Sequence, residues 1–173
     1  RGDKPVRAFI FTHSHLDHFG GALGVVTPEQ VAQGKLRVVA PMGFMEEATS
    51  ENVLAGQTML RRAGNMYGMN LPRGPRAYVD TGLGKNPAYG TFSILPPTDL
   101  IDHTGQKLEL DGVEFVFLNA PGSEAPAELA VYLPRNTALC GAEVVSRAIH
   151  TRHTPRGPQV GDALRWGGDS GPL

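Results

Sequence analysis

Residues 12–18 read Thr-His-Ser-His-Leu-Asp-His. Because side chains alternate along a strand, His13 and His15 at the end of a strand point to the same side. Asp17 and His18 follow where the chain turns into a helix, so they can face a second position beside the first. Imidazole and carboxylate groups are the ligands that zinc takes when thiolates are absent. The segment therefore predicts a metal site, and a histidine-rich surface loop is the alternative.

A buried strand is predicted directly before this segment, because Val6–Thr12 is rich in β-branched and aromatic residues. The sequence predicts one helix from Thr27, a second from Pro41 to about Gly68 with a break near residues 50–52, and a third from Glu143 to about His150. Further strands are expected at Leu36–Ala40, Thr91–Leu95, Leu108–Leu110, Val113–Asn119, Leu129–Leu133 and Thr137–Gly141, with a long loop at Asn70–Ala88 and a frayed end beyond Trp166. This order predicts a layered α/β fold with mixed sheets.

The composition narrows the class of protein. The chain has 173 residues, enough for one domain with its own core. A formal net charge of -1 gives no electrostatic case for nucleic acid or for an anionic membrane. No stretch approaches the ~18 apolar residues of a membrane span. The single cysteine, Cys140, excludes an intrachain disulfide, and we expect it to be a small buried core residue.

Two carboxylates far along the chain follow apolar strands. Glu124 comes after the strand that ends at Asn119, and Glu143 comes after the strand that ends at Gly141. Ligands carried by a sheet converge from such positions on one edge, so both are candidate metal ligands. Glu128 competes with Glu124, and is otherwise expected to support a ligand or to face solvent. His103 lies in a predicted turn, where a solvated histidine is commoner than a ligand.

Taken together, these motifs resemble the alkyl (linear primary) sulfatases of the metallo-β-lactamase superfamily. Residues 13–18 match the superfamily signature HxHxDH, and the strings PGSEAP and GAE are similar to the sulfatase motifs PGTEAP and AED or AE. Further similar strings are SENVLAG, RRAG, MYG and GLGK, in this order after the signature. The resemblance covers the chain to about residue 166, and it implies a metallo-β-lactamase-like αββα sandwich.

The resemblance also implies an activity and its cofactor: hydrolysis of alkyl sulfate esters, such as dodecyl sulfate, with two Zn²⁺ ions per site in the complete protein. One zinc would be held by His13, His15 and Glu124. The other would be held by Asp17 and His18, with Glu143 bridging the two ions. Asp17 could in addition orient the attacking water.

The same resemblance assigns the substrate contacts. Arg156 would grip the sulfate, because a guanidinium fork pairs bidentately with a tetrahedral oxyanion. Tyr67 could line the pocket, or it could simply pack at a helix end. The family's last zinc ligand is a histidine after the Arg-Gly stretch. Since His150 and His153 both precede Arg156, that ligand is expected past residue 173.

The chain is therefore expected to be a partial catalytic domain spanning residues 1–173, incomplete at both ends. The first strands of the sandwich, the dimerisation region and the lipid-binding-like C-terminal domain of the family would lie outside it. The complete protein is expected to be a homodimer that acts on a small-molecule substrate. Family members are often periplasmic or secreted, but the compartment of this chain stays open. Two alternatives are lactone, thioester or phosphodiester hydrolysis on the same fold, and a metal-binding fragment without activity.

Overall fold

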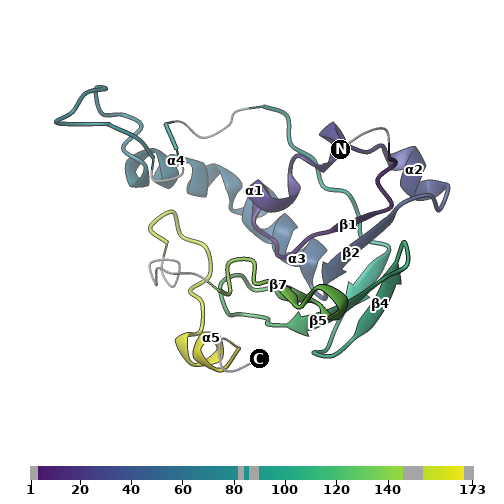
Figure 1. Cartoon of the computed structure of the whole chain (residues 1–173). Coiled ribbons are helices and arrows are strands. Elements are labelled where there is room, and N and C mark those ends of the chain that lie inside the picture. The colour runs from purple at the N-terminus through teal and green to yellow at the C-terminus, as the bar shows by residue number, and fades with distance from the viewer. Residues whose placement is uncertain (1–3, 82–83, 86–89, 146–153, 170–173) are drawn as a thin grey trace.

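The computed structural model describes residues 4–81, 84–85, 90–145 and 154–169. Its first sheet has three parallel strands in the order β1-β2-β3, which are β1 (Ala8–Ile10), β2 (Arg37–Pro41) and β3 (Asp99–Ile101). Helices lie on one side of this sheet, and the second sheet lies on the other (Figure 1). The described residues therefore form successive layers, as the sequence predicted.

The second sheet is an antiparallel meander of four strands. Its order is β4 (Lys107–Leu110), β5 (Val113–Asn119), β6 (Leu129–Leu133) and β7 (Ala138–Cys140). The turn between β4 and β5 has φ values of 52° at Asp111 and 76° at Gly112. Positive φ at both central residues suits a tight hairpin and favours an Asp-Gly pair, so the predicted turn is confirmed.

Strand β2 explains how the layers are held together. Val38 and Ala40 face the helices, where they pack in a buried cluster with Phe11 and Phe44. Val39 faces the opposite way, into a second cluster between the two sheets. Since successive side chains leave a strand on opposite faces, the apolar run of β2 builds both cores at once.

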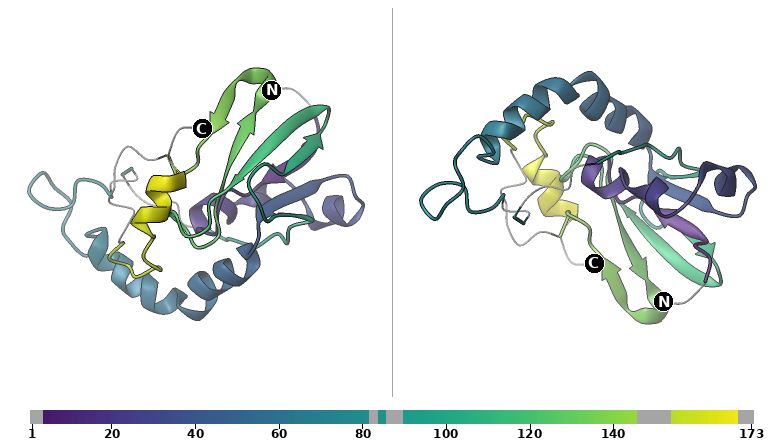
Figure 2. Two further views of the ribbon diagram at one scale, coloured as in Figure 1. Left: turned by 90° about the horizontal axis from the view of Figure 1, so that it is seen from below. Right: turned by 90° about the horizontal axis from the view of Figure 1, so that it is seen from above.

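A helical rod runs along one side of the molecule. It comprises α3 (Phe44–Thr49), a π-helical turn η2 (Ser50–Leu54) and α4 (Gly56–Met66), so the break predicted near residues 50–52 is confirmed. In both views of Figure 2 the yellow C-terminal segment passes this rod, and its residues 157–159 line a pocket with residues of the rod before the segment forms α5 (Ala163–Asp169). The remaining helical elements are α1 (Leu16–Phe19), η1 (Ala22–Gly24), α2 (Pro28–Ala32) and η3 (Pro134–Asn136).

The start of α2 has the helix-start pattern that the sequence predicted. The side chain of Gln30 accepts a hydrogen bond from the backbone N–H of Thr27 at 2.8 Å, and the Thr27 side chain meets the backbone of Gln30 in return. This reciprocal arrangement is a capping box, and Pro28 occupies the first helical position. The helix expected from Thr27 is thus confirmed, although it ends at Ala32.

Two local predictions were wrong, and one strand was not predicted. Thr91–Leu95 forms no strand, because the backbone N–H of Ser93 bonds to the carbonyl of Gly20 and joins no sheet ladder. Instead Asp99–Ile101, which follows two prolines, completes the first sheet. Cys140 is exposed, since β7 is the outer strand of its sheet.

The chain end also differs from the prediction, because α5 is helical to Asp169. The carboxylate of Asp162 accepts hydrogen bonds from the backbone N–H groups of Leu164 and Arg165, which caps this helix. Of the helix expected after Glu143, Val144 lies in a turn and Val145 in a bend. Its remainder, with His150 and His153, lies outside the described residues.

Candidate metal centre

The histidine-rich segment is fixed at the point where the two sheets meet. The backbone N–H of Leu129, at the start of β6, donates to the carbonyl of Thr12 at 2.8 Å, and His13 pairs with Glu128 in an antiparallel bridge. His13 is fully buried, and its Nδ1 lies 3.0 Å from the Thr12 hydroxyl. The Thr12 contact occupies Nδ1, so Nε2 is the atom left to face the candidate site.

Four side chains from three distant parts of the chain converge here. His13, His15, Glu124 and Glu143 each offer one donor atom, and these atoms all lie within 4.8 Å of one another. Oε2 of Glu143 is 3.6 Å from His13 Nε2 and 4.0 Å from His15 Nδ1. Oε2 of Glu124 is 3.9 Å from His13 Nε2 and 3.1 Å from His15 Nδ1. The structure therefore brings together the two glutamates and two of the histidines that the sequence singled out.

Glu124 and Glu128, which the sequence left in competition, have different surroundings. Oε2 of Glu128 accepts hydrogen bonds from the Ser123 hydroxyl at 2.8 Å and from the backbone N–H groups of Glu124 and Ala125 at 2.7 and 2.9 Å. Glu128 is fully buried, and burial raises its pKa. Glu128 thus holds the loop that carries Glu124, while the Glu124 carboxyl itself faces the histidines.

Asp17 and His18 lie beside this cluster at the more open side. Nε2 of His18 is 3.8 Å from Oε1 of Glu143 and 3.5 Å from a carboxyl oxygen of Asp17. The side chain of Asp17 is 67% exposed, against 0% for His13. The two oxygens of Glu143 therefore face different groups, Oε2 the buried cluster and Oε1 the His18 side.

Arg156 approaches the site from the C-terminal segment. Its guanidinium forms an ion pair with Glu51, whose other carboxyl oxygen lies 3.7 Å from His15 Nε2. Tyr67 ends helix α4, and its pKa is raised by burial and by the negative charges of Asp17 and Glu143, while Arg156 lowers it. Arg156 and Tyr67 thus lie close to the cluster. His103, by contrast, sits in an exposed turn against Asp102.

Sequence reasoning missed Glu51. The only signals were its place in the string SENVLAG and the break in helical periodicity near residues 50–52. A break of this kind is a π-helical turn here, and such turns often occur at functional sites.

Charge in the cluster is distributed unevenly. Burial, together with the charges of His18 and His15, lowers the pKa of His13 to about 3, so its ring is neutral at pH 7. Burial alone would also lower the pKa of His15, but the carboxylates of Glu124, Glu143 and Glu51 outweigh it and raise the pKa to about 10. The contact with His15 is the main cause that lowers the pKa of Glu143 to about 2. Without a metal, His15 therefore carries a proton at pH 7 beside the ionised carboxylate of Glu143.

The donor set suits a metal ion. Among the described residues, His13 Nε2 and Glu124 Oε2 are buried without a hydrogen-bond partner, since the 3.1 Å approach of His15 to Glu124 is not aligned as a hydrogen bond. Buried polar atoms without partners are rare, and a missing ion is one of their ordinary explanations. Imidazole nitrogens and carboxylate oxygens are also the donors that divalent transition metals take in proteins. The residues present therefore fit a metal centre.

Comparison with known proteins agrees with this fold and cluster. The sequence profile described as "Metallo-beta-lactamase superfamily" matches residues 1–156. The chain belongs to this superfamily. Metal ions are implied by that membership, and the metallo-β-lactamase-like α/β fold predicted from the sequence is confirmed. A solved metallo-beta-lactamase, IND-7, shares the fold at 16% identity, with a TM-score of 0.51 over 98% of this chain and 55% of its own.

More similar relatives are alkylsulfatases. A linear primary-alkylsulfatase from Pseudomonas sp is 45% identical over 96% of this chain and 25% of its own length. The alkyl/aryl-sulfatase BDS1 from Saccharomyces cerevisiae is 43% identical over 96% of this chain and 26% of its own. The solved sec-alkylsulfatase Pisa1 from Pseudomonas sp. has a TM-score of 0.91 at 44% identity, over 98% of this chain and 27% of its own. The chain thus spans about a quarter of the length of the curated relatives it matches.

No helix among the described residues combines the length and the apolar character that a membrane crossing needs.

Proposed function

We propose that this chain carries the metal centre of an enzyme that hydrolyses alkyl sulfate esters, such as dodecyl sulfate, to alcohol and sulfate. One observation carries the proposal. The cluster of His13, His15, Glu124 and Glu143 lies near the guanidinium of Arg156, and Glu51 contacts both His15 and Arg156. A metal centre beside an arginine suits an ester with one negative charge. The identity of the alkylsulfatase relatives over nearly the whole chain supports the same substrate class.

The metal that we propose is zinc, with two ions in the complete protein. His13, His15 and Glu124 would hold one ion and Asp17 and His18 the other, with Glu143 between them. The two carboxyl oxygens of Glu143 face these two groups separately, which suits a bridging ligand. When bound, zinc lowers the pKa of the water that it holds and withdraws charge from oxygen atoms of the substrate.

The chain's own residues would then bind and orient the substrate. The Arg156 side chain is 22% exposed, so a sulfate oxyanion could reach its remaining N–H donors and pair with two of them. Tyr67 would line the same entrance. Asp17, the most exposed of the proposed ligands, would accept a hydrogen bond from the attacking water and so orient it. Glu128 would keep Glu124 in place through the three hydrogen bonds that it accepts.

The experiment compares rates of hydrolysis of dodecyl sulfate, an aryl phosphate and a lactone by the zinc-loaded 173-residue chain, and measures zinc per chain. Two equivalents of zinc with faster turnover of dodecyl sulfate would support the proposal. Faster turnover of the phosphate or the lactone would overturn the substrate class. One equivalent or none, without turnover, would favour a metal-binding fragment. The homodimer expected for the full-length protein remains a separate prediction.

A further inference from the structure

Glu51 touches both halves of the proposed site without belonging to the four-donor cluster. It lies in the π-helical turn between α3 and α4, and its side chain is only 10% exposed. Its Oε2 lies 3.7 Å from His15 Nε2, and its Oε1 accepts a hydrogen bond from Arg156. The carboxylate is therefore shared between a proposed metal ligand and the proposed sulfate-binding residue.

The two ring nitrogens of His15 face different groups. Nδ1 faces the carboxyl oxygens of Glu124 and Glu143 inside the cluster, whereas Nε2 faces Glu51 outside it. A histidine that binds a metal through one nitrogen usually donates the N–H of the other to a carboxylate or a carbonyl. Such a partner fixes the tautomer and the orientation of the ring. Glu51 lies on that side of His15 as an ion-pair partner, with its Oε2 3.7 Å from Nε2.

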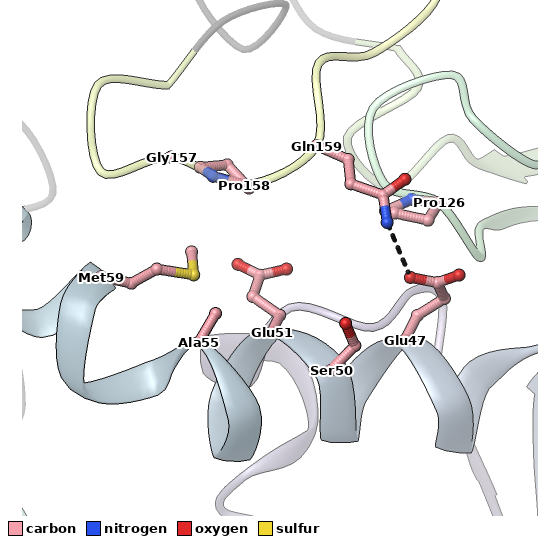
Figure 3. Close-up of a pocket in the computed structure, with 9 residues that line it drawn as sticks. All are labelled: Glu47, Ser50, Glu51, Ala55, Met59, Pro126, Gly157, Pro158 and Gln159. Carbon is pink, nitrogen blue, oxygen red and sulfur yellow. Dashed lines mark hydrogen bonds between the residues drawn. The ribbon is translucent and has the colours of Figure 1, made fainter.

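Glu51 is held in place by its surroundings. Figure 3 shows its carboxylate rising from the helical rod toward the segment Gly157–Gln159, beside that of Glu47 one turn earlier. Both glutamates line a pocket of about 80 Å³, together with Met59 and residues of the facing segment. Because the Glu51 side chain is mostly buried, its contacts with His15 and Arg156 are screened less than those of a surface carboxylate.

We propose that Glu51 is a positioning residue that couples the metal centre to the sulfate-binding arginine, an inference that rests on the proposed function. One oxygen orients His15 for the metal, and the other orients Arg156 for the sulfate. A guanidinium has five N–H donors, so the bond to Glu51 leaves others for an oxyanion. Orientation of both groups before substrate arrives reduces the entropy that binding must overcome.

The test replaces Glu51 by glutamine in the 173-residue chain. Glutamine has the same shape but a single acceptor atom, so it cannot serve the donors of His15 and Arg156 together. We expect zinc affinity, measured by competition with a chelator, to fall about 10- to 100-fold. We also expect the affinity for inorganic sulfate, measured by calorimetry on the zinc-loaded chain, to fall at least about threefold.

The matched control is Glu47→Gln. Glu47 lines the same pocket and accepts a hydrogen bond from Gln159 Nε2 at 3.4 Å, and no contact with His15 or Arg156 is found for it among the described residues. Both affinities should stay within about twofold of those of the unsubstituted chain. If Glu51→Gln does not fold, Glu51→Asp keeps the charge but shortens the side chain, and should weaken both affinities in the same direction.

A double-mutant cycle with Arg156→Gln tests whether Glu51 acts through Arg156. The effect of Glu51→Gln on sulfate affinity should disappear when Arg156 is already absent. Unchanged zinc affinity in Glu51→Gln would overturn the inference, as would an equal loss of sulfate affinity in both backgrounds. Failure of the unsubstituted chain to hydrolyse dodecyl sulfate would instead count against the proposed function. The two failures can be told apart, because the zinc measurement needs no turnover.

Discussion

The loop that carries Glu124 is held by one buried carboxylate, so neutralising Glu128 should loosen it. In Glu128→Gln, three hydrogen bonds lose a charged acceptor, those from Ser123 Oγ, Glu124 N and Ala125 N. Hydrogen bonds to a charged group contribute about 1.5–3 kcal/mol each, and neutral ones about 1 kcal/mol. The three together would lose about 1.5–6 kcal/mol. An amide is easier to bury than a carboxylate, which leaves a net loss of about 2 kcal/mol.

This loss should be visible in thermal unfolding of the metal-free chain, followed by circular dichroism. For a protein of this size, about 2 kcal/mol corresponds to a Tm lower by about 4–8 °C. Because one of the three donors is the backbone N–H of Glu124, zinc affinity should also fall, by about 10-fold, as for other residues that support a ligand.

The control is Glu114→Gln on β5. Glu114 is 49% exposed and pairs with Lys107 at 3.4 Å, and surface pairs of this kind contribute at most about 1 kcal/mol. The Tm of the Glu114→Gln chain should change by less than about 3 °C, and the zinc affinity of that chain should not change. If Glu128→Gln behaved like this control in both measurements, the argument that Glu128 positions Glu124 would be refuted.

Two further predictions concern the charge of the cluster and the core beneath it. The pKa of His15 is raised to about 10 without metal, and a metal binds only the neutral ring. Zinc affinity, measured by competition with a chelator, should therefore rise by up to about tenfold per pH unit from pH 7 to 9. Constant affinity over this range would contradict the assignment of His15 as a metal ligand. Phe44 is fully buried and stacks on Phe11, with 5.1 Å between the ring centroids. Phe44→Ala should therefore lower the free energy of unfolding by about 3–5 kcal/mol, measured with urea. The control Phe92→Ala, at a 56% exposed position, should change it by less than about 1 kcal/mol. Equal losses in the two variants would show that Phe44 is not part of the core.

Local sequence patterns predicted most of the fold. The run VRAFIFT, the Asp111-Gly112 turn and the Thr27-Pro28 helix start depend on neighbouring residues, so they can be recognised without knowing the rest of the chain. Thr91–Leu95 was mispredicted for the opposite reason. Whether a short apolar run becomes a strand depends on whether a partner strand is available, and here Gly20 took its hydrogen bond.

The sequence by itself determined which residue types could bind metal, because the spacing of His13, His15, Asp17 and His18 is a local property. It also indicated Glu124 and Glu143, through motifs that resemble those of a known family. Only the tertiary structure decided that these carboxyl groups meet the imidazoles, that Glu128 supports the loop instead of facing the cluster, and that Glu51 connects His15 to Arg156. The physical reason is that most of these contacts join residues far apart in the chain, such as Glu51 and Arg156, and depend on how the sheets and the helical rod pack.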